Sequence, residues 1–553
     1  MKKKLFLLPL LAALALTGCS SDEDLGNGSK EDGNGYGYVA VNIVQPKSVD
    51  TRSNDANNFE EGSTAENEAQ TGLFFIFNSS GNIVGDSQTV NLSGNNNPTS
   101  EPPYVERVYN AVLVIDGAAS KPTDAYQIVC VLNAPTGLST DITKLSDLTE
   151  KIDNYAANNT SAGTFIMTNS VYKDNNNKVL GAIVETDKIV ESPSKALETP
   201  VDVYVERVVA KIRAKSTENF SNNGAKPTID GTEKQLTIKI TGIEVANIAE
   251  KSYLFKNIEN ISYTWSWNDA TNKRSYWETV PNINDTEESK KLTFFNQSYN
   301  DIVTNSPKEE SATDFDISKV TTTNFCKYVQ PNTSTKKTAI LVTAQLMDGD
   351  SPADLAYVNK GFYTTKDGAM NYLLALLKNK GWYKKDGSKP ITTLAASDIV
   401  WKNNNDEGIS VNGLKSYEVV AQLASSVDKI YNSEGTEVSD GVTTVNNYLV
   451  SDEAKDYRAR IFTDGKCYYF VNIEQTPVAI DNGYNLTDPA LEGVIRNHIY
   501  DLTLKSIKGI GTPVFDPTDV IIPEKPTDEQ TWFLAAQINV LDWRLVKQTI
   551  DFE

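Results

Sequence analysis

The sequence predicts an all-β protein made of two β-sandwich domains with Greek-key connections and few short helices. Three observations support this. Short apolar segments with a period of two recur along the 553 residues, as in strands that bury one face. Clusters of Asn, Ser, Gly and Pro separate them and are typical of turns. One segment has clear helical spacing, and the chain is too long for one ordinary core.

The N-terminus has the pattern of an export signal. Three lysines at positions 2–4 precede an apolar run over 5–16, the arrangement of a secretory signal. The run is shorter than the ~20 apolar residues that cross a bilayer. It ends in Leu-Thr-Gly-Cys at 16–19, which resembles a bacterial lipobox and implies acylation of Cys19. An ordinary signal peptide is the alternative.

An acidic stretch follows at 20–24. It resembles the signal that sends Bacteroidetes lipoproteins to the outer face of the outer membrane, although a solvated tether has the same composition.

The first strand of the folded body is expected over 38–44. Val39, Val41 and Ile43 alternate with smaller or polar residues and therefore share one face. The polar segment 48–70 behind it is expected to be an exposed loop, and it contains Arg52, the first arginine of the chain.

Further strands are predicted over 73–77, 126–132, 201–212, 236–240, 340–346, 468–473 and 500–504. Within 201–212 the apolar residues change parity across Glu206 and Arg207, which indicates a bulge or a strand that passes between sheets. We place a domain boundary just beyond this change.

One helix is predicted near residue 373. Met370, Leu373, Leu374 and Leu377 follow the i, i+3, i+4, i+7 spacing, and Gly381 ends the pattern. Such a stripe is expected to pack in a core.

The last part of the chain is organised differently. Prolines at 513, 517, 523 and 526 stiffen a linker, and a strand-like segment follows over 536–552. Its apolar residues form two sets of opposite parity: Ile538 and Val540, then Leu541, Trp543 and Leu545. A strand on such an arm need not pair with its own body, although folding back on its own sheet is the alternative.

Composition excludes several classes of function. There are 73 acidic and 52 basic residues, a net charge of −21, so nucleic acid is not an expected partner. His498 is the single histidine, which excludes multi-histidine metal sites, and no two of the four cysteines form a C-x-x-C pair. Cys130 lies in an apolar run and is expected to be a buried, inert thiol. We expect no metal, cofactor or catalytic residue.

Four segments together resemble a known family. They are Val205–Lys211 (VERVVAK), Arg496–Leu502 (RNHIYDL), Lys505–Gly511 (KSIKGIG) and Ile538–Trp543 (INVLDW). They resemble the fimbrillins of the Bacteroidales, in particular Mfa-type shaft subunits of the minor fimbria, a type V pilus. The resemblance implies transthyretin-like Greek-key sandwiches and a role in adhesion and biofilm formation.

The resemblance also implies a maturation route. Such subunits are exported as lipoproteins and are cut by an arginine-specific protease in the loop after the first strand, which here corresponds to the bond between Arg52 and Ser53. The implied parts are a signal peptide (1–19), a propeptide with the removable strand (20–52), two sandwiches (53–214 and 215–511) and a linker with a donor strand (512–553). The membrane would be contacted only through the lipid on Cys19.

Removal of the first strand would leave an apolar groove with unpaired backbone groups. A groove of this kind accepts a strand from another chain. We expect Ile538, Val540, Leu541, Trp543 and Leu545 of another copy, or of a related fimbrial subunit, to fill it. Joints of this kind do not close on themselves and therefore build a filament on the cell surface.

Other functions remain as alternatives. A monomeric glycan-binding surface lipoprotein is one, because Trp265 and Trp267 share a parity, although core packing also explains them. A tip or anchor subunit is another. An enzyme with paired carboxylates has no spacing to support it, and the segment 348–352 places Pro352 where a calcium loop needs Asp or Asn. His498 is expected to be structural.

Overall fold

The fold was analysed in a computed structural model. It describes residues 37–46, 62–93, 105–115, 122–157, 159–161, 163–174, 177–259, 278–309, 312–473, 493–526, 533–542 and 545–547.

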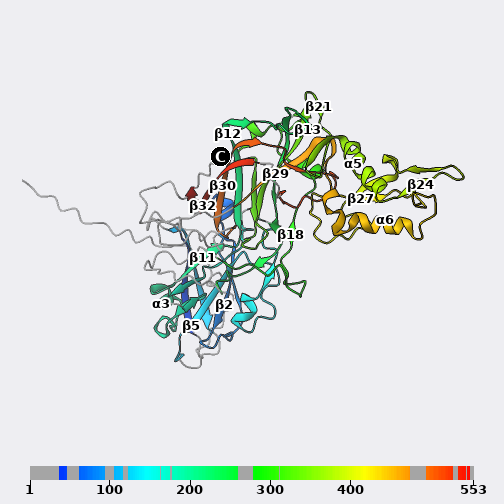
Figure 1. Cartoon of the computed structure of the whole chain (residues 1–553). Coiled ribbons are helices and arrows are strands. Elements are labelled where there is room, and N and C mark those ends of the chain that lie inside the picture. The colour runs from blue at the N-terminus through cyan, green and yellow to red at the C-terminus, as the bar shows by residue number, and fades with distance from the viewer. Residues whose placement is uncertain are drawn as a thin grey trace, which may run out of the picture.

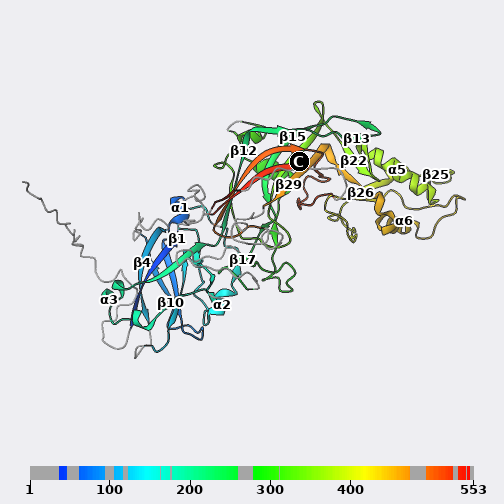
Figure 2. The same cartoon turned by 60° about the vertical axis from the view of Figure 1, so that its left-hand side comes forward.

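The first lobe is one sheet that curls around its own core (Figures 1 and 2). Its strands are β1 (Gly37–Pro46), β2 (Thr71–Phe77), β3 (Gln88–Asn91), β4 (Val105–Ile115), β5 (Tyr126–Leu132), β7 (Met167–Asn169), β10 (Ala182–Val184) and β11 (Val201–Arg207). They follow the order β3-β2-β5-β7-β11-β1-β4, with β10 paired to β5. Val41, Phe75, Leu113 and Val129 are fully buried in the shared interior. The strands predicted over 38–44, 73–77 and 126–132 are confirmed as β1, β2 and β5.

The second lobe is a sandwich of two sheets. One contains β12 (Ala210–Asn222), β19 (Cys326–Val329), β30 (His498–Lys508), β32 (Phe533–Asp542) and β33 (Leu545–Lys547); the other contains β15 (Thr237–Ala246), β20 (Ala339–Asp348), β21 (Ser351–Pro352), β29 (Lys466–Asn472) and β31 (Thr512–Pro513). Ile212 and Leu502 of the first sheet belong to one buried cluster with Ile243 and Val342 of the second. Alternating apolar residues thus fill the space between two sheets, as in other sandwiches.

The change of parity at Glu206 and Arg207 marks the passage between the lobes. The strand β11 ends at Arg207 in the first sheet, and β12 begins at Ala210 in the second lobe. Val205 faces the first core and Ile212 the second, so the predicted strand that passes between sheets is confirmed.

An extension with its own core projects from the second lobe, as the position of α5 and α6 in Figure 1 shows. It contains α5 (Thr365–Asn379), α6 (Gly441–Val450), β26 (Ile399–Lys402) and β27 (Val420–Leu423), beside a sheet of β13 (Thr228–Ile229), β14 (Thr232–Glu233), β22 (Leu355–Val358), β23 (Gly361–Thr364) and β28 (Arg460–Phe462). The predicted helix is confirmed as α5: Met370, Leu373 and Leu377 are buried, and Gly381 has φ +79° just after the helix.

The remaining elements are short. They are α1 (Thr64–Asn67), α2 (Leu145–Thr149), α3 (Pro193–Glu198), α4 (Tyr299–Asn305), β6 (Ile152–Asp153), β8 (Tyr172–Asp174), β9 (Asn177–Val179), β16 (Ile248–Ala249), β17 (Ser252–Tyr253), β18 (Phe294–Phe295), β24 (Tyr383–Lys385) and β25 (Ile391–Thr393). The all-β class with few short helices is therefore confirmed, although α4 and α6 were not predicted. No helix in the described part of the chain is long and apolar enough to cross a membrane.

Candidate functional site

The strand β1 is hydrogen-bonded to a neighbour on each side. It runs parallel to β11 from Val41, opposite Val201, to Val44, and antiparallel to β4 from Gly37, opposite Ile115, to Gln45. Figure 2 shows β1 beside β4 in the first lobe. The predicted removable strand is therefore an interior strand of its sheet, although it comes first in the chain.

The inner face of β1 contributes to the core of the first lobe. The side chains of Val39, Val41 and Ile43 are 0% exposed and belong to the same buried cluster as Phe75 and Leu113. Burial of each such side chain stabilises a fold by ~1.5–3 kcal/mol. Without β1, this interior would lose three apolar side chains at once.

The outer face of β1 is partly covered. Ala40 is 1% exposed and packs with Val112 of β4 and Ala196 of α3. Two residues further, the Asn42 Nδ2 donates to Asp202 Oδ1 of β11 at 3.1 Å. The position of Ala40 therefore accepts only a small side chain, whereas the position of Asn42 suits an amide.

Gln88 of β3 holds the far edge of β4. Its Nε2 donates to the Val114 carbonyl oxygen at 2.7 Å, and its Oε1 accepts from the Val114 N–H at 2.8 Å. One amide side chain thus bridges the two ends of the curled sheet. Because β4 pairs with β1 alone among the described strands of the sheet, Gln88 and the packing of β4 in the core would have to hold β4 if β1 were absent.

The chain behind the predicted cleavage loop is anchored separately from β1. Ser63 and Glu66 form a capping box at α1. The Glu66 carboxylate lies 2.9 Å from Lys211 Nζ and accepts from the Tyr328 hydroxyl at 2.7 Å. Burial by itself raises the pKa of Glu66, but the Lys211 charge and hydrogen bonds from Lys211, Tyr328 and Ser63 outweigh it, and the pKa is lowered to about 2. A cut at Arg52 would therefore break the covalent link between β1 and α1 while α1 stays bound.

Residues of two family motifs meet where the lobes join. Arg207 Nε donates to the Glu66 carbonyl oxygen at 2.9 Å, and its Nη1 donates to Asn497 Oδ1 at 3.1 Å. The Asn497 N–H in turn donates to the Val209 carbonyl oxygen at 2.7 Å. Asn497 has φ +58°, a conformation that asparagine tolerates better than most residues.

A buried ion pair completes this junction. Arg496, which is 0% exposed, lies 2.8 Å from Glu278, and its guanidinium also donates to the carbonyl oxygens of Leu254 and Tyr253 at 2.9 and 2.8 Å. A second buried pair joins Lys256 to Glu206 at 2.8 Å. We define Glu206, Arg207, Lys256, Glu278 and Arg496 as the polar junction. Sequence reasoning identified the motifs but not their partners, which are distant in sequence.

The predicted donor strand pairs within its own chain. Ile538 and Val540 lie in β32, opposite Leu502 and Tyr500 of β30, and Leu541 lies opposite Ile499. Leu545 begins β33, which pairs with β32 on its other side. Figure 1 shows β32 beside β30 in the second lobe. In the isolated chain the tail thus folds back on its own sheet, the alternative that its sequence pattern left open.

The proline-rich segment before the tail lies against the body. Val514 and Ile521 are buried with Tyr299 of α4 and Phe470 of β29. The Tyr468 hydroxyl donates to the Ile522 carbonyl oxygen at 3.0 Å. Prolines at 513, 517 and 523 therefore belong to a bound segment and not to a free linker.

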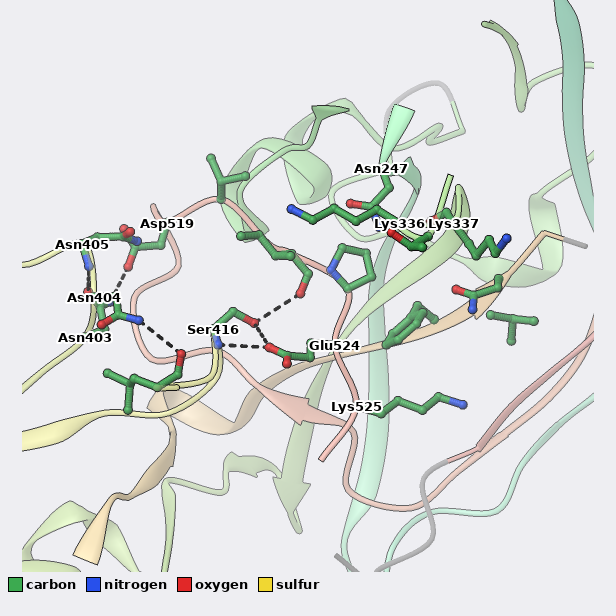
Figure 3. Close-up of a pocket in the computed structure, with 18 of the residues that line it drawn as sticks. Asn247, Lys336, Lys337, Asn403, Asn404, Asn405, Ser416, Asp519, Glu524 and Lys525 are labelled. Atoms are coloured by element: carbon green, nitrogen blue, oxygen red, sulfur yellow. Dashed lines mark hydrogen bonds between the residues drawn. The ribbon is translucent and has the colours of Figure 1, made fainter. Parts of the chain in front are cut away.

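Glu524 anchors this segment shortly before the tail. Its carboxylate accepts from Lys415 Nζ at 2.8 Å. It also accepts from the Ser416 N–H at 3.2 Å and from the Ser416 hydroxyl at 3.1 Å, and Figure 3 shows these two residues side by side. Burial raises the pKa of Glu524, but these partners outweigh it, and the pKa lies below its usual range. Nearby, Asn403 Nδ2 donates to Asp519 Oδ2 at 2.5 Å.

Beside the anchor lies a cleft of about 1200 Å³. Its lining combines amide, lysine and acidic side chains with apolar ones, and Asn403, Asn404, Asn405, Lys336 and Lys337 are drawn in Figure 3. It has no cluster of histidine, cysteine or carboxylate groups suited to a metal, and none was found elsewhere among the described residues.

Several predicted residues lie outside the described residues: Cys19, Arg52, Ser53, Trp265, Trp267 and Trp543. His498 is 3% exposed, and its Nδ1 lies 2.7 Å from the Arg496 carbonyl oxygen. Cys130 is a buried thiol, as expected, and burial raises its pKa. Asp348 pairs with Ser351 in a tight hairpin, and its carboxylate lies 3.2 Å from Lys234 Nζ.

Comparison with known proteins gives one family match. Residues 460–549 match the model described as major fimbrial subunit protein type IV, fimbrillin, C-terminal. This range contains β29, β30 and β32. The resemblance to fimbrillins is thereby confirmed for this part of the chain. No curated protein sequence matches the chain.

Solved structures with a similar arrangement share little sequence identity. A candidate cell adhesion protein from Parabacteroides distasonis is 14% identical, with 92% of this chain and 98% of that chain covered and a TM-score of 0.40. The fimbrilin FimA of Porphyromonas gingivalis W83 is 15% identical, with coverage of 92% and 99% and a TM-score of 0.33. The tip fimbrial protein Mfa3 of Porphyromonas gingivalis is 11% identical, with coverage of 92% and 100% and a TM-score of 0.32. These TM-scores are too low to bear on function.

Proposed function

We propose that this chain is a fimbrial subunit that polymerises when the tail of one copy replaces β1 of the next. The observation that carries the proposal is the position of β1 between β4 and β11, with Val39, Val41 and Ile43 fully buried. The fimbrillin match over residues 460–549 supports it, because that range includes the tail strand.

The precursor is closed in this proposal. It is exported with a lipid on Cys19, and β1 occupies its own groove while β32 pairs with β30. Neither the groove nor the tail is then available to another copy. This arrangement prevents assembly before the subunit reaches the cell surface.

Cleavage between Arg52 and Ser53 severs the covalent link between β1 and the rest of the body, so that β1 can dissociate and the groove can open. Departure of β1 leaves the backbone groups of β4 and β11 that faced it without partners, and it exposes the core that Val39, Val41 and Ile43 had filled. A strand from another copy restores both the hydrogen bonds and the apolar packing. In the groove, an inserted strand would have β4 on one side and β11 on the other. In its own chain, β32 has β30 on one side and only the short β33 on the other.

The resulting joint is expected to dissociate very slowly. Three or more buried apolar side chains at ~1.5–3 kcal/mol each, together with two rows of backbone hydrogen bonds, stabilise it. Because each copy offers one groove and one tail, the joints run head to tail and build a filament on the cell surface. Partners are other copies, related fimbrial subunits and an arginine-specific protease, and the role is adhesion without catalysis.

Proteolysis of the purified precursor tests the proposal. An arginine-specific protease should produce a chain that begins at Ser53 and forms a ladder of oligomers on gels run without boiling. Arg52→Ala should remain uncut at this bond and monomeric. Removal of residues 533–553 should allow the cut but abolish the ladder. A full-length tail on a chain that begins at Ser53 and yet stays monomeric would rule out assembly by strand replacement.

The form present on cells separates the alternatives. N-terminal sequencing of the surface protein should find Ser53. A chain that still begins at lipidated Cys19 would instead favour an anchor subunit or a monomeric lipoprotein. Saturable sugar binding that is lost when Trp265 or Trp267 is replaced would favour a glycan-binding protein.

A further inference from the structure

The beginning of the tail strand repeats the removable strand in sequence. Residues 38–43 read Tyr-Val-Ala-Val-Asn-Ile, and residues 533–538 read Phe-Leu-Ala-Ala-Gln-Ile. The third and sixth residues are identical, the first is aromatic in both, the fifth carries an amide, and the others are aliphatic. The two matching segments lie in β1 and β32, which belong to different sheets.

We propose that the tail enters the groove in the direction of β1 and in one register, with Phe533 at the position of Tyr38 and Ile538 at that of Ile43. The inference rests on the proposed function and specifies its joint. It commits to a second copy of this chain as the partner and to residues 533–538 as the first part of the donor strand.

The outer face of β1 selects this register. Ala40 is 1% exposed beneath Ala196 of α3, so its substitute must be small. The proposed register supplies Ala535 there. It also places Gln537 at the position of Asn42, where an amide donates to Asp202 Oδ1.

The inner face agrees with the same register. Leu534, Ala536 and Ile538 take the positions of Val39, Val41 and Ile43, all of which are 0% exposed. The fit is weakest at Val41, where Ala536 is smaller than the residue it replaces. Trp532 falls at the position of Gly37, where a Cβ would lie 2.6 Å from Ile189 Cγ2, so in this register the inserted strand has to begin at Phe533.

Other registers place unsuitable residues at these positions. A shift of one residue turns Gln537 toward the core at Val41 or Ile43, because side chains alternate faces. A shift of two residues places either Gln537 or Phe533 at Ala40, beneath α3. If the tail ran opposite to the direction of β1, with Ala535 still at the position of Ala40, Phe533 would lie at the position of Asn42 and Trp532 at that of Ile43.

Disulfide trapping between two chains tests the register. One chain carries Asp202→Cys and the other Gln537→Cys, both with Cys326→Ser, and they are mixed during cleavage at Arg52. Cα partners on adjacent strands lie within disulfide reach, so a covalent dimer is expected. Asn539→Cys mixed with Asp202→Cys reports the register shifted by two residues and should give at least about ten-fold less dimer. Within one chain, Gln537→Cys with Thr503→Cys reports the folded-back tail, because these residues are Cα partners in β32 and β30.

A pair of matched substitutions gives a second readout. Ala535→Leu should block the oligomer ladder, because the larger side chain meets Ala196, whereas Ala536→Val should fill the space left at Val41 and slow dissociation on heating by roughly ten-fold. The shifted register predicts that Ala535→Leu is tolerated, since Ala535 would then occupy the position of Tyr38. Circular dichroism and cleavage at Arg52 show whether each variant is folded.

The outcomes separate the two proposals. Two outcomes would overturn the register but keep strand replacement. One is a normal ladder whose covalent dimers form through Asn539→Cys, and the other is an Ala535→Leu chain that forms the same ladder as the unchanged chain. Cleaved chains of the unchanged sequence that form no ladder, together with cleaved Gln537→Cys chains that give no dimer with Asp202→Cys, would overturn the proposed function itself.

Discussion

At the scale of residues, the polar junction explains what the motif residues do. Glu206, Arg207 and Arg496 are charged, yet each is at most 4% exposed. Their charges are compensated by partners distant in sequence, such as Glu278 and Lys256. Buried charges without partners are costly, so the junction can form only when both lobes are folded and correctly joined.

Replacement of Glu278 should be strongly destabilising. Glu278→Gln removes the negative charge beside Arg496, which is 0% exposed, and leaves a buried guanidinium without a counter-ion. We expect a loss of ~3–5 kcal/mol in the free energy of unfolding, measured by urea denaturation. Glu259→Gln is the control, because the Glu259–Lys178 pair at 3.4 Å is exposed and should change stability by less than ~0.5 kcal/mol. Equal effects of the two substitutions would contradict this view of the junction.

Glu66 should make the free energy of unfolding depend on pH in the acidic range. The pKa of its carboxyl falls from an ordinary 4.5 to about 2 in the folded chain. A lowered pKa contributes stability above pH 4.5, and this contribution is lost as the pH falls toward 2. The shift corresponds to about 3 kcal/mol. Between about pH 5 and pH 2, unfolding experiments should show the unchanged chain losing that much more stability than Glu66→Gln, and parallel pH profiles would refute the assignment.

At the scale of elements, the groove depends on strands that stay in place without β1. The strand β11 retains β7 as a neighbour, but β4 has no other strand partner among the described strands of its sheet. Its remaining support is core packing, the contact of Val112 with α3 and the two hydrogen bonds with Gln88. If β1 leaves, Gln88 therefore supplies the hydrogen bonds that still hold β4 to its sheet.

Gln88→Ala should affect the cleaved chain more than the precursor. The two hydrogen bonds together are worth ~1–3 kcal/mol, and in the precursor β1 still holds β4 through their ladder. We expect slower assembly and faster amide exchange in β4 after cleavage, measured by mass spectrometry. Thr89→Ala, on the same strand and exposed, should behave as the unchanged chain. Identical exchange in both cleaved variants would show that β4 is retained by packing alone.

At the scale of the whole molecule, the bound segment around Glu524 sets how far the tail can reach. The segment is bound to the body up to Pro526: the Lys525 carbonyl oxygen accepts from the Tyr417 hydroxyl at 3.4 Å, and Pro526 is buried. From Thr527 to Trp532, six extended residues span at most roughly 22 Å. In the proposed polymer the joint is therefore short, and neighbouring subunits lie close together.

Weakening the anchor should loosen the arm without unfolding the body. Glu524→Gln removes the charge that Lys415 holds at 2.8 Å. Amide exchange over 512–526 should accelerate, while exchange in β20 and β29 stays unchanged. In the unchanged chain the same loosening should appear at acidic pH, because the pKa of Glu524 is lowered in the folded state and its contacts are lost on protonation. Lys429→Gln, in an exposed pair with Glu437, is the control.

Much of the architecture could be predicted from the sequence. The period of two located β1, continuous apolar runs located β2 and β5, the parity change at Glu206 located the passage between lobes, and the helical stripe located α5. These signals are local, because they depend on which face of an element is buried. The partners of Arg496 and the role of Gln88 carry no local signal, since their contacts join residues far apart in the chain.

The sequence by itself determined that the chain is mostly β, that Val39, Val41 and Ile43 form one buried face, and that the tail has the pattern of a strand. Only the tertiary structure decided that β1 is an interior strand and that the tail rests on β30. The physical reason is that alternation specifies which side chains are buried but not which neighbour supplies the hydrogen bonds. The tail and β1 carry similar short patterns, so in the proposed assembly their pairing depends on which groove is open.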